Sequence, residues 1–560
     1  MLDLLLPMSW FACCFLAAAP DLSQLSKEIP LKQLASGSPD VFSQSLSNVN
    51  GTEKDGSSQD MLTPIYAVTI TFAIGVTIAL ILHIYLGEVA SQVFVKGALV
   101  SDHERCTTLG QRVLHDHGSS VDAAIATVLC LGVVHPHVSG IGGGGVMMVH
   151  DIHKNETRVI NFQGTAPRTL TEDMLQNVSE LKAGLQVGVP GMLRGLHLAH
   201  WLHGSLSWED VVMRAAAVAR EGFNVSFSLA KLKGEQLSQH FRGTFFPGGK
   251  PLRPGSFLRL PGLARVLEAG LSKFYDGNFS QEIVDEVRMN GGVLSREDIS
   301  NYSVKVEQPA EGLYNEFIIQ VPPPPSAGAA LISAFNILEG FHLNDINNTD
   351  NQTNHWITEA LNAAVAMASG LGDPKYDSSV TKLLSHMLSK NHADVLHQRI
   401  NYSHASPPEN YSSTPHSLQT ELQAGQVVVM GPDDLVVSVA SSLGRNRVQP
   451  GKRPLSYLTP TIVMPAWYRC GIYLAVSSSG GKQRFSAITQ LMFALNDITL
   501  VISCFPNCPS SAEFLEDDVL LLYEDSHVFQ KVKTNFVVQG ILRSEDNIKA
   551  IAIPLSDGSL

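Results

Sequence analysis

Cysteine and positive charge are both scarce in this 560-residue sequence. Its 7 cysteines are too few for a disulfide scaffold, and no CxxC…CxxC or HExxH spacing occurs, which excludes a structural zinc site. Lys and Arg number 39 against 52 Asp and Glu, so the formal net charge is −13. A nucleic-acid-binding protein needs a basic surface to neutralise phosphates, and this charge balance argues against nucleic acid as a partner.

Charged residues of either sign are also few. They make up 16% of the chain, whereas hydrophobic residues make up 44%. This composition supplies enough apolar side chains for a sizeable core and is too apolar for a mostly disordered protein. The length fits one large domain or two to three ordinary ones.

One long segment lacks charge entirely. Residues 65–86 form a 22-residue apolar run without Asp, Glu, Lys or Arg. At about 1.5 Å per residue such a helix spans the roughly 30 Å hydrocarbon core of a bilayer, so we expect a single transmembrane helix here. Residues 1–19 are apolar and signal-like but carry Asp3 instead of basic residues, so their role as a signal peptide stays open. We expect residues 1–64 to form a flexible tail.

Glycosylation sequons suggest the orientation of this span, because Lys and Arg are sparse on both sides of it. Asn50 is the only sequon before the span, and the others follow it. The later ones are Asn155, Asn177, Asn224, Asn278, Asn301, Asn347, Asn351, Asn401 and Asn410. We therefore expect a single-pass type II membrane protein whose globular region is lumenal or extracellular.

The chain from about residue 100 onward has the pattern of a globular protein. Apolar residues at helical spacing predict a helix within 116–134, capped by Ser119 or Ser120. Ser295 and Asp298 form a capping-box-like helix start. Runs rich in β-branched residues predict strands at 427–430, 435–439 and 471–476. Helices and strands in the same domain indicate a layered α/β or α+β fold.

Two glycine-rich segments could carry chemistry. The run at 139–145 could cradle an anion or simply make a tight turn, and it is not a P-loop because no Gly-Lys-Ser/Thr follows. Gly480 and Gly481 follow a predicted strand, where their amides could stabilise an oxyanion or end the strand in an ordinary turn. The histidines of His135-Pro-His137 are more often structural or exposed than metal ligands. No GxSxG elbow is present, which argues against an unrelated serine hydrolase.

Several motifs together resemble the gamma-glutamyltransferase (glutathione hydrolase) family. They are DHGSSVDAAIATVLCLGVVHPHVSGIGGGG, LQVGVPGMLRGLHLAH, NGGVLSREDISNY, GLGDPKY, and KRPLSYLTPTIV followed by SSSGGKQ. The resemblance covers about residues 100–488. It implies an αββα sandwich of the N-terminal-nucleophile hydrolase type, with a large-subunit-like region at 87–423 and a small-subunit-like region at 424–560.

The resemblance also implies a reaction. A precursor cleaves itself, and the small subunit's new N-terminal Thr attacks the γ-glutamyl amide of glutathione, with its own α-amine as base. Water, an amino acid or a peptide accepts the glutamyl group, and the family uses no metal or organic cofactor. The large and small subunits pair only if self-cleavage occurs.

The sequence departs from this family pattern at the reacting centre. Ala424 falls where the nucleophilic Thr belongs, and Thr420 and Thr414 are nearby but out of register. Gln163 falls where an Arg pairs with the substrate carboxylate, and a Gln cannot supply bidentate charge pairing. By alignment, Gly480 and Gly481 match the oxyanion glycines, and Ser456 matches the first of two substrate-binding serines, the second of which is Tyr457.

A further departure is a gap at 443–448, where the family has a few tens more residues. The gap is either genuine or an artefact of the gene model. Two classes of function therefore stay open. One is an active hydrolase and transferase of glutathione and other γ-glutamyl peptides, and the other is a catalytically inactive, membrane-anchored homologue with a binding or regulatory role.

Overall fold

The computed structural model describes one compact unit within Lys96–Leu560, separate from Met1–Val95. The described residues are Gly75, Thr77, 97–175, 182–232, 239–341, 350–400, 424–444, 449–466, 471–479, 488–489, 520–521, 530–531, 537–544 and 547–553. Within these residues, no helix has the length and apolar character needed to cross a bilayer. The transmembrane helix predicted at 65–86 lies outside them except for Gly75 and Thr77, as does the tail at 1–64.

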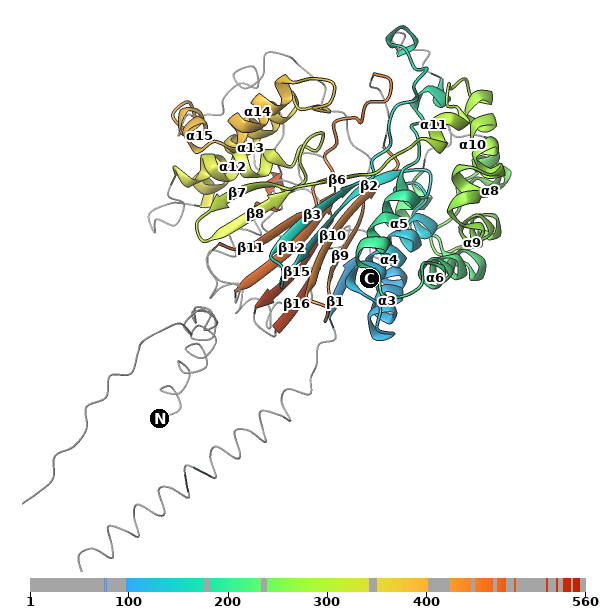
Figure 1. Cartoon of the computed structure of the whole chain (residues 1–560), viewed down its shortest axis with the longest axis horizontal. Helices are drawn as coiled ribbons and strands as arrows, with labels where there is room; N and C mark the ends of the chain where they lie inside the picture. The colour runs from blue at the N-terminus through green and yellow to red at the C-terminus, as the bar shows by residue number, and fades with distance from the viewer. Residues whose placement is uncertain are drawn as a thin grey trace, which may run out of the picture. The chain divides into compact units, whose positions relative to one another are not determined.

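Two six-stranded antiparallel sheets form the centre of this unit (Figure 1). The first has the order β1-β9-β10-β2-β3-β6 and the second has the order β16-β15-β12-β11-β8-β7. The strands of the first sheet are β1 (Ala98–Ser101), β2 (Gly144–Asp151), β3 (Glu156–Asn161), β6 (Lys305–Glu307), β9 (Gly425–Met430) and β10 (Leu435–Ser442). The strands of the second sheet are β7 (Ala310–Tyr314), β8 (Phe317–Val321), β11 (Thr461–Pro465), β12 (Ile472–Ser479), β15 (Val537–Ser544) and β16 (Asn547–Ile553).

Helices cover the outer face of each sheet. Those of the first layer are α3 (Glu104–His115), α4 (Ser120–Val134), α5 (Met192–His203), α6 (Trp208–Glu221), α9 (Pro261–Tyr275), α10 (Asn278–Met289) and α11 (Arg296–Ser300). Those of the second layer are α12 (Ala329–Glu339), α13 (Asp350–Ala368), α14 (Ser379–Leu388) and α15 (Lys390–His397). Shorter elements are α7 (Phe227–Ala230), α8 (Gln239–Phe245), β4 (Phe223–Asn224), β5 (Phe257–Leu258), β13 (Leu520–Leu521) and β14 (Gln530–Lys531). The predicted αββα layering is thus present.

The strand period divides the core into three apolar layers. Successive residues of a strand point to opposite faces, so Val427 and Val429 of β9 join the core beneath the first helix layer. Val428 and Met430 instead join the core between the two sheets, together with Ile462 of β11. A third core joins the second sheet to α12 and α13. The strands predicted at 427–430, 435–439 and 471–476 are confirmed as parts of β9, β10 and β12.

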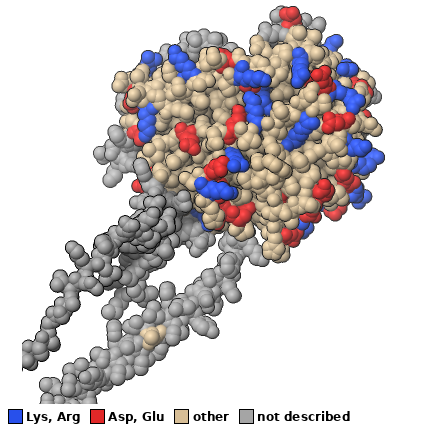
Figure 2. All heavy atoms as spheres, viewed as in Figure 1, with Lys and Arg blue, Asp and Glu red and all other residues tan. Residues whose placement is uncertain are grey.

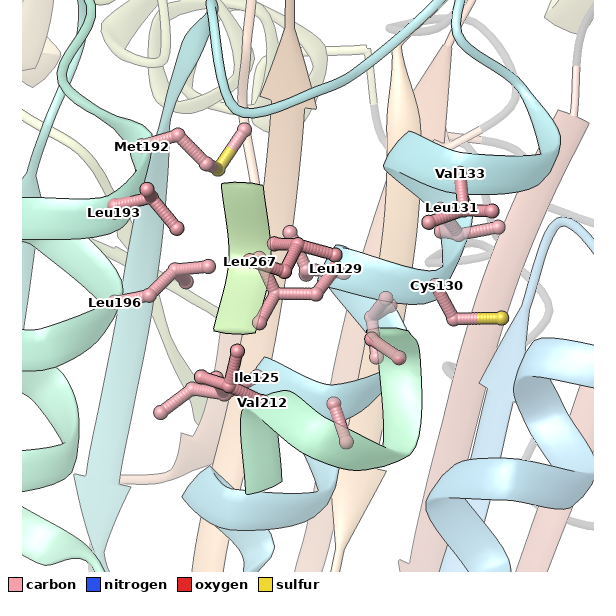
Figure 3. Close-up of a cluster of buried hydrophobic side chains, with 14 of the residues drawn as sticks. Ile125, Leu129, Cys130, Leu131, Val133, Met192, Leu193, Leu196, Val212 and Leu267 are labelled. Atoms are coloured by element: carbon pink, nitrogen blue, oxygen red, sulfur yellow. The ribbon is translucent and has the colours of Figure 1, made fainter. Parts of the chain in front are cut away.

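Helix α4 is the central element of the first core. All its residues from Ser120 to Val134 are buried, as expected for a helix that is apolar on every side. Its Ile125 and Leu129 lie among side chains of α5, α6 and α9, including Leu196 (Figure 3). The helix predicted within 116–134 is confirmed, and Ser119, rather than Ser120, is its N-cap.

Local capping signals in the sequence determine two helix starts. Ser119 accepts from the backbone N–H of Asp122, whose carboxylate accepts from the N–H of Ser119. Ser295 and Asp298 make the same reciprocal pair before α11. Each box satisfies two backbone donors that a helix start leaves without partners. The capping box predicted at Ser295 is confirmed.

A disulfide joins α3 to α4 through Cys106 and Cys130, which are 24 residues apart and fully buried. This bond was not predicted, because the chain has few cysteines and they form no pattern typical of a disulfide scaffold. Nothing in the spacing of the cysteines identified this pair. Disulfides of this kind persist in oxidising compartments.

The asparagines of four predicted glycosylation sites are exposed, namely Asn155, Asn224, Asn278 and Asn301. Asn351 lies in α13, where its side chain is not described, and Asn177, Asn347, Asn401 and Asn410 lie outside the described residues. On the face shown in Figure 2, acidic and basic side chains are interspersed. That face carries no broad basic surface of the kind that binds nucleic acid.

Candidate active site at the start of β9

Ala424 directly precedes β9, between the two sheets. Its side chain is 2% exposed and forms a small apolar cluster with Ala440 of β10 and Leu458. A methyl group has no lone pair to attack a carbonyl and no proton to exchange with a base. The position that the family pattern assigns to the nucleophile is therefore buried, well packed and chemically inert.

The next residue, Gly425, has a pair of buried hydroxyls beside it. Ser441 Oγ donates to the carbonyl of Gly425 at 3.2 Å and lies 2.8 Å from Ser139 Oγ. A Cβ at Gly425 would lie 2.9 Å from Ser441 Oγ and 3.2 Å from Ser139 Cβ. These hydroxyls thus fix the beginning of β9 and leave little room for a side chain at Gly425. Ser139 belongs to the glycine-rich run, but its sequence position did not indicate this contact.

The other glycines of that run allow close approach between backbone segments. The carbonyl of Gly143 accepts from the N–H groups of Gly191 and Met192 at 3.0 and 3.1 Å. A Cβ at Gly143 would lie 2.4 Å from the carbonyl oxygen of Ser442, and one at Gly144 would lie 2.4 Å from that of Phe162. The interpretation of the run as a tight turn is confirmed.

A partly exposed carboxyl group lies close to the same strand. Asp102 follows β1, and its Oδ2 accepts from the backbone N–H of Gln426 at 2.7 Å. Its Oδ1 accepts from Nε2 of Gln539 on β15 at 3.2 Å, so the residue links the two sheets. Burial raises the pKa of Asp102 to about 7, because the charged form loses its hydration. Sequence reasoning missed this group, since its partners are 324 and 437 residues away.

Gln163 lies just beyond β3 and is 4% exposed. Its backbone N–H donates to Asn161 Oδ1 at 3.2 Å, and its carbonyl accepts from the hydroxyl of Tyr302 at 2.8 Å. Within the described part of the chain, neither Oε1 nor Nε2 of its amide has a hydrogen-bond partner. An unpaired buried amide is costly, so this side chain is available to a polar ligand or to water.

Ser456 is fixed by its backbone. Its N–H donates to the carbonyl of Pro325 at 2.9 Å, and its carbonyl accepts from the N–H of Ala327 at 2.8 Å. Its Oγ accepts from the N–H of Leu458 at 3.1 Å, and Leu458 packs on Ala424. Ser456 is thus hydrogen-bonded to Leu458, whose side chain packs on Ala424 at the nucleophile position.

The segments that carry Gln163 and Ser456 also meet through their backbones. The N–H of Ala166 donates to the carbonyl of Lys452, and the N–H of Gly451 donates to the carbonyl of Ala166, both at 3.0 Å. The structure thus brings the two segments together across nearly 300 residues of sequence.

The histidines at 135 and 137 pack in a row with His103. Ring centroids are 5.3 Å apart for His103 and His135 and 5.6 Å apart for His135 and His137, all edge-on. Burial lowers the pKa of His137 to about 4, so its ring is neutral at pH 7. Across the described residues no group of three or more His, Cys, Asp or Glu side chains is placed to hold a metal ion.

Comparisons with known proteins agree with the motifs. The gamma-glutamyltranspeptidase family model matches residues 106–446, more than half of the chain. The chain belongs to this family. It is 42% identical to human Glutathione hydrolase 7 over 604 aligned residues, covering 96% of this chain and 90% of that protein. It is 30% identical to Glutathione hydrolase 2 of Arabidopsis thaliana, covering 74% of this chain and 81% of that one.

Solved structures support the same fold. The cephalosporin acylase of Bacillus halodurans superposes with a TM-score of 0.69 at 21% identity, covering 83% of this chain and 95% of that one. The gamma-glutamyltranspeptidase of Helicobacter pylori superposes with a TM-score of 0.53 at 27% identity, covering 57% and 97%. The predicted family and its mixed α/β N-terminal-nucleophile hydrolase fold are confirmed.

Part of the predicted site in this gamma-glutamyltranspeptidase homologue cannot be placed. Gly480 and Gly481 lie outside the described residues, and β12 is described up to Ser479, so their oxyanion role stays a prediction. The gap at 443–448 falls after β10, which remains intact to Ser442. Whether the gap is genuine therefore stays open, and it lies in the connection that follows β10.

Proposed function

We propose that this chain handles glutathione and related γ-glutamyl peptides in the hydrolysis and transfer reaction of its family. The observation that carries the proposal is its 42% identity to human Glutathione hydrolase 7 across 96% of the chain. In that reaction an N-terminal hydroxyl attacks the γ-glutamyl amide, and water, an amino acid or a peptide takes the glutamyl group. With Ala424 in place, the hydroxyl has to come from another residue, and Thr420 and Thr414 are the threonines that precede it most closely in sequence.

A specific observation favours a second function, which is binding of γ-glutamyl compounds without turnover. The Ala424 methyl is buried against Ala440 and Leu458 at the nucleophile position. Gln163 offers an uncharged amide where the family pattern has a guanidinium. A scaffold of this kind would serve as an inactive, membrane-anchored homologue with a binding or regulatory role.

Two measurements on the purified full-length chain separate these functions. The first is release of the aniline from a γ-glutamyl anilide, and the second is N-terminal sequencing of fragments on a reducing denaturing gel. Turnover together with a new N-terminus at Thr420 or Thr414 supports the enzyme. A single uncleaved chain with turnover at the buffer level leaves only the binding function.

An Ala424→Thr variant sharpens this test by restoring the family residue. If the remaining site is competent, we expect self-cleavage before residue 424 and measurable anilide turnover, with Ala424→Val as a control of equal shape but no hydroxyl. Cleavage without turnover would place the second defect at Gln163 or at the 443–448 gap.

We also propose that the chain is a single-pass type II membrane protein with its globular region in the lumen or outside the cell. The uncharged run at 65–86, the exposed sequon asparagines and the Cys106–Cys130 disulfide all support this placement. Endoglycosidase treatment should increase gel mobility, and an unchanged mobility would argue against the lumenal placement.

A further inference from the structure

A cavity of about 210 Å³ lies outside the apolar pocket of Ala424. Its walls come from five segments: the chain after Gln163, the chain at Val189, α11 with the residues leading into β6, the residues around Asp373, and the turn before Ser456. The volume is an order of magnitude above the roughly 10–15 Å³ that one water molecule requires. The cavity therefore has room for a small solute.

The charge of this cavity is opposite to that of the whole chain. Its lining contains four cationic side chains, Arg168, Lys305, Lys375 and Arg453, against two carboxylates, Asp298 and Asp373. The described lining thus has an excess of two positive charges, in a protein of formal net charge −13. A concave site with this balance attracts anions.

Arg453 is the most buried of these cations, with 5% of its surface exposed. Its Nη2 donates to the carbonyl of Ser303 at 2.7 Å, and its guanidinium carbon lies 5.8 Å from the centre of the Tyr302 ring. Its Nε is buried and has no acceptor among the described residues. A buried guanidinium donor without an acceptor is costly, and the Arg453 charge is therefore incompletely neutralised beside the cavity that this residue lines.

The carboxylate of Asp373 does not neutralise the positive charge of the cavity, because it also accepts hydrogen bonds from backbone groups. Asp373 accepts from the backbone N–H groups of Lys375 and Arg453, both at 3.2 Å. Lys305 Nζ approaches it only to 3.5 Å. The side chain of Lys305 is 29% exposed, so its ammonium can also reach a ligand that enters from solvent.

We propose that this cavity binds the oxyanion group of a small molecule, either a carboxylate or a phosphate, through Arg453 and Lys305. Arginine forms paired, charge-assisted hydrogen bonds with both groups, and a nearby lysine adds a point charge. Neither Ala424 nor Gln163 lines the cavity, although Tyr302 of its lining donates to the carbonyl of Gln163. Asn301 is part of its lining and is also a predicted glycosylation site.

Isothermal titration calorimetry of the purified, deglycosylated full-length chain tests the proposal. N-acetylglycine and N-acetylglycinamide differ only in the carboxylate, and inorganic phosphate serves as a third probe at equal ionic strength. We expect N-acetylglycine, phosphate or both to bind at least tenfold more tightly than the neutral amide. Which of the two binds more tightly identifies the kind of oxyanion.

The variant Lys305→Gln tests the location of the site. The Lys305 side chain is partly exposed, so this variant should fold even if a change of the buried Arg453 to Gln prevents folding. It should weaken anion binding at least tenfold. Lys390→Gln removes the same charge from a surface pair with Glu339 and should have no effect. The proposal is overturned if neither N-acetylglycine nor phosphate binds, or if N-acetylglycinamide binds as tightly as they do. It is also overturned if the Lys305→Gln and Lys390→Gln variants bind the anion with the same affinity. Loss of binding in Gln163→Ala but not in Lys305→Gln would place the anion in the γ-glutamyl site instead.

Discussion

At the scale of single residues, Asp102 is a partly exposed carboxyl group that connects β9 to β15. The loss of hydration at this position raises its pKa to about 7. Between its usual pKa of 3.8 and about 7, the folded chain holds a proton that the unfolded chain releases. The free energy of unfolding from this group is therefore greatest below pH 4 and decreases as the pH rises to about 7.

An Asp102→Asn variant should remove that pH dependence, because an amide can replace the protonated carboxyl but does not titrate. We expect the stability of the variant, relative to wild type, to increase between pH 4 and pH 7. Urea unfolding of the full-length chain across this range measures the effect. Asp210→Asn, which removes an exposed carboxylate of α6, is the control and should retain the wild-type slope. Parallel profiles for wild type and Asp102→Asn would contradict the raised pKa.

Gly425→Ala should destabilise the chain by about 1–3 kcal/mol, the usual cost of overpacking. The added methyl would lie 2.9 Å from Ser441 Oγ. In a Ser441→Ala background the same change should cost less, because the obstructing oxygen is gone, and the two unfolding free energies form a double-mutant cycle. Strictly additive costs would show that the hydroxyl is not the obstacle.

At the scale of secondary-structure elements, the Cys106–Cys130 bond is the covalent link between α3 and α4. In the Cys106→Ala, Cys130→Ala double variant we expect a loss of about 3 kcal/mol, because the bond closes a loop of 24 residues in the unfolded chain. Thermal unfolding of oxidised wild type, reduced wild type and the double variant provides the comparison. Equal midpoints for all three would mean that the bond adds nothing to stability.

The elements that could be predicted from the sequence are those that depend on residues close together in the chain. The starts of α4 and α11 depend on residues three positions apart, so a capping pattern is sufficient to find them. The strands β9, β10 and β12 are evident from their β-branched residues. By contrast, Ser139 meets Ser441 across 302 residues, and Asp102 meets Gln539 across 437. Such pairs depend on how the sheets pack, and no local pattern encodes them.

The candidate site likewise has residues that could be located from the sequence and features that could not. Family motifs located Ala424, Gln163 and Ser456, because each lies within a distinctive run of sequence. The unpaired amide of Gln163 and the unpaired Nε of Arg453 become evident only in the folded structure, where distant segments have met. The cation-rich cavity likewise draws its walls from segments far apart in the chain.

At the scale of the whole molecule, the order of strands is the feature with the widest consequence. In the first sheet, β9 and β10 of the small-subunit-like region lie between β1 and β2 of the large-subunit-like region. In the second sheet, β8 of the large-subunit-like region pairs with β11, and β7 lies beyond β8 at the edge. Both cores therefore contain side chains from both regions.

A cut before residue 424, whether by self-cleavage of an Ala424→Thr variant or by an added protease, should therefore leave the assembly intact. We expect two bands on a denaturing gel but a single species of unchanged size on gel filtration in native buffer. Separation of the two fragments under native conditions would contradict this interleaving of strands.

Because the strands of the two regions alternate, the fold can remain assembled even where the polypeptide chain is no longer continuous. Hydrogen bonds along β1–β9 and β10–β2, together with the shared cores, should keep the two fragments associated in native buffer after a cut. The cut would give β9 a free N-terminal end at Ala424. We therefore expect the fold to persist with or without cleavage, so the chemistry at residue 424 could be lost while the folded body around it remains.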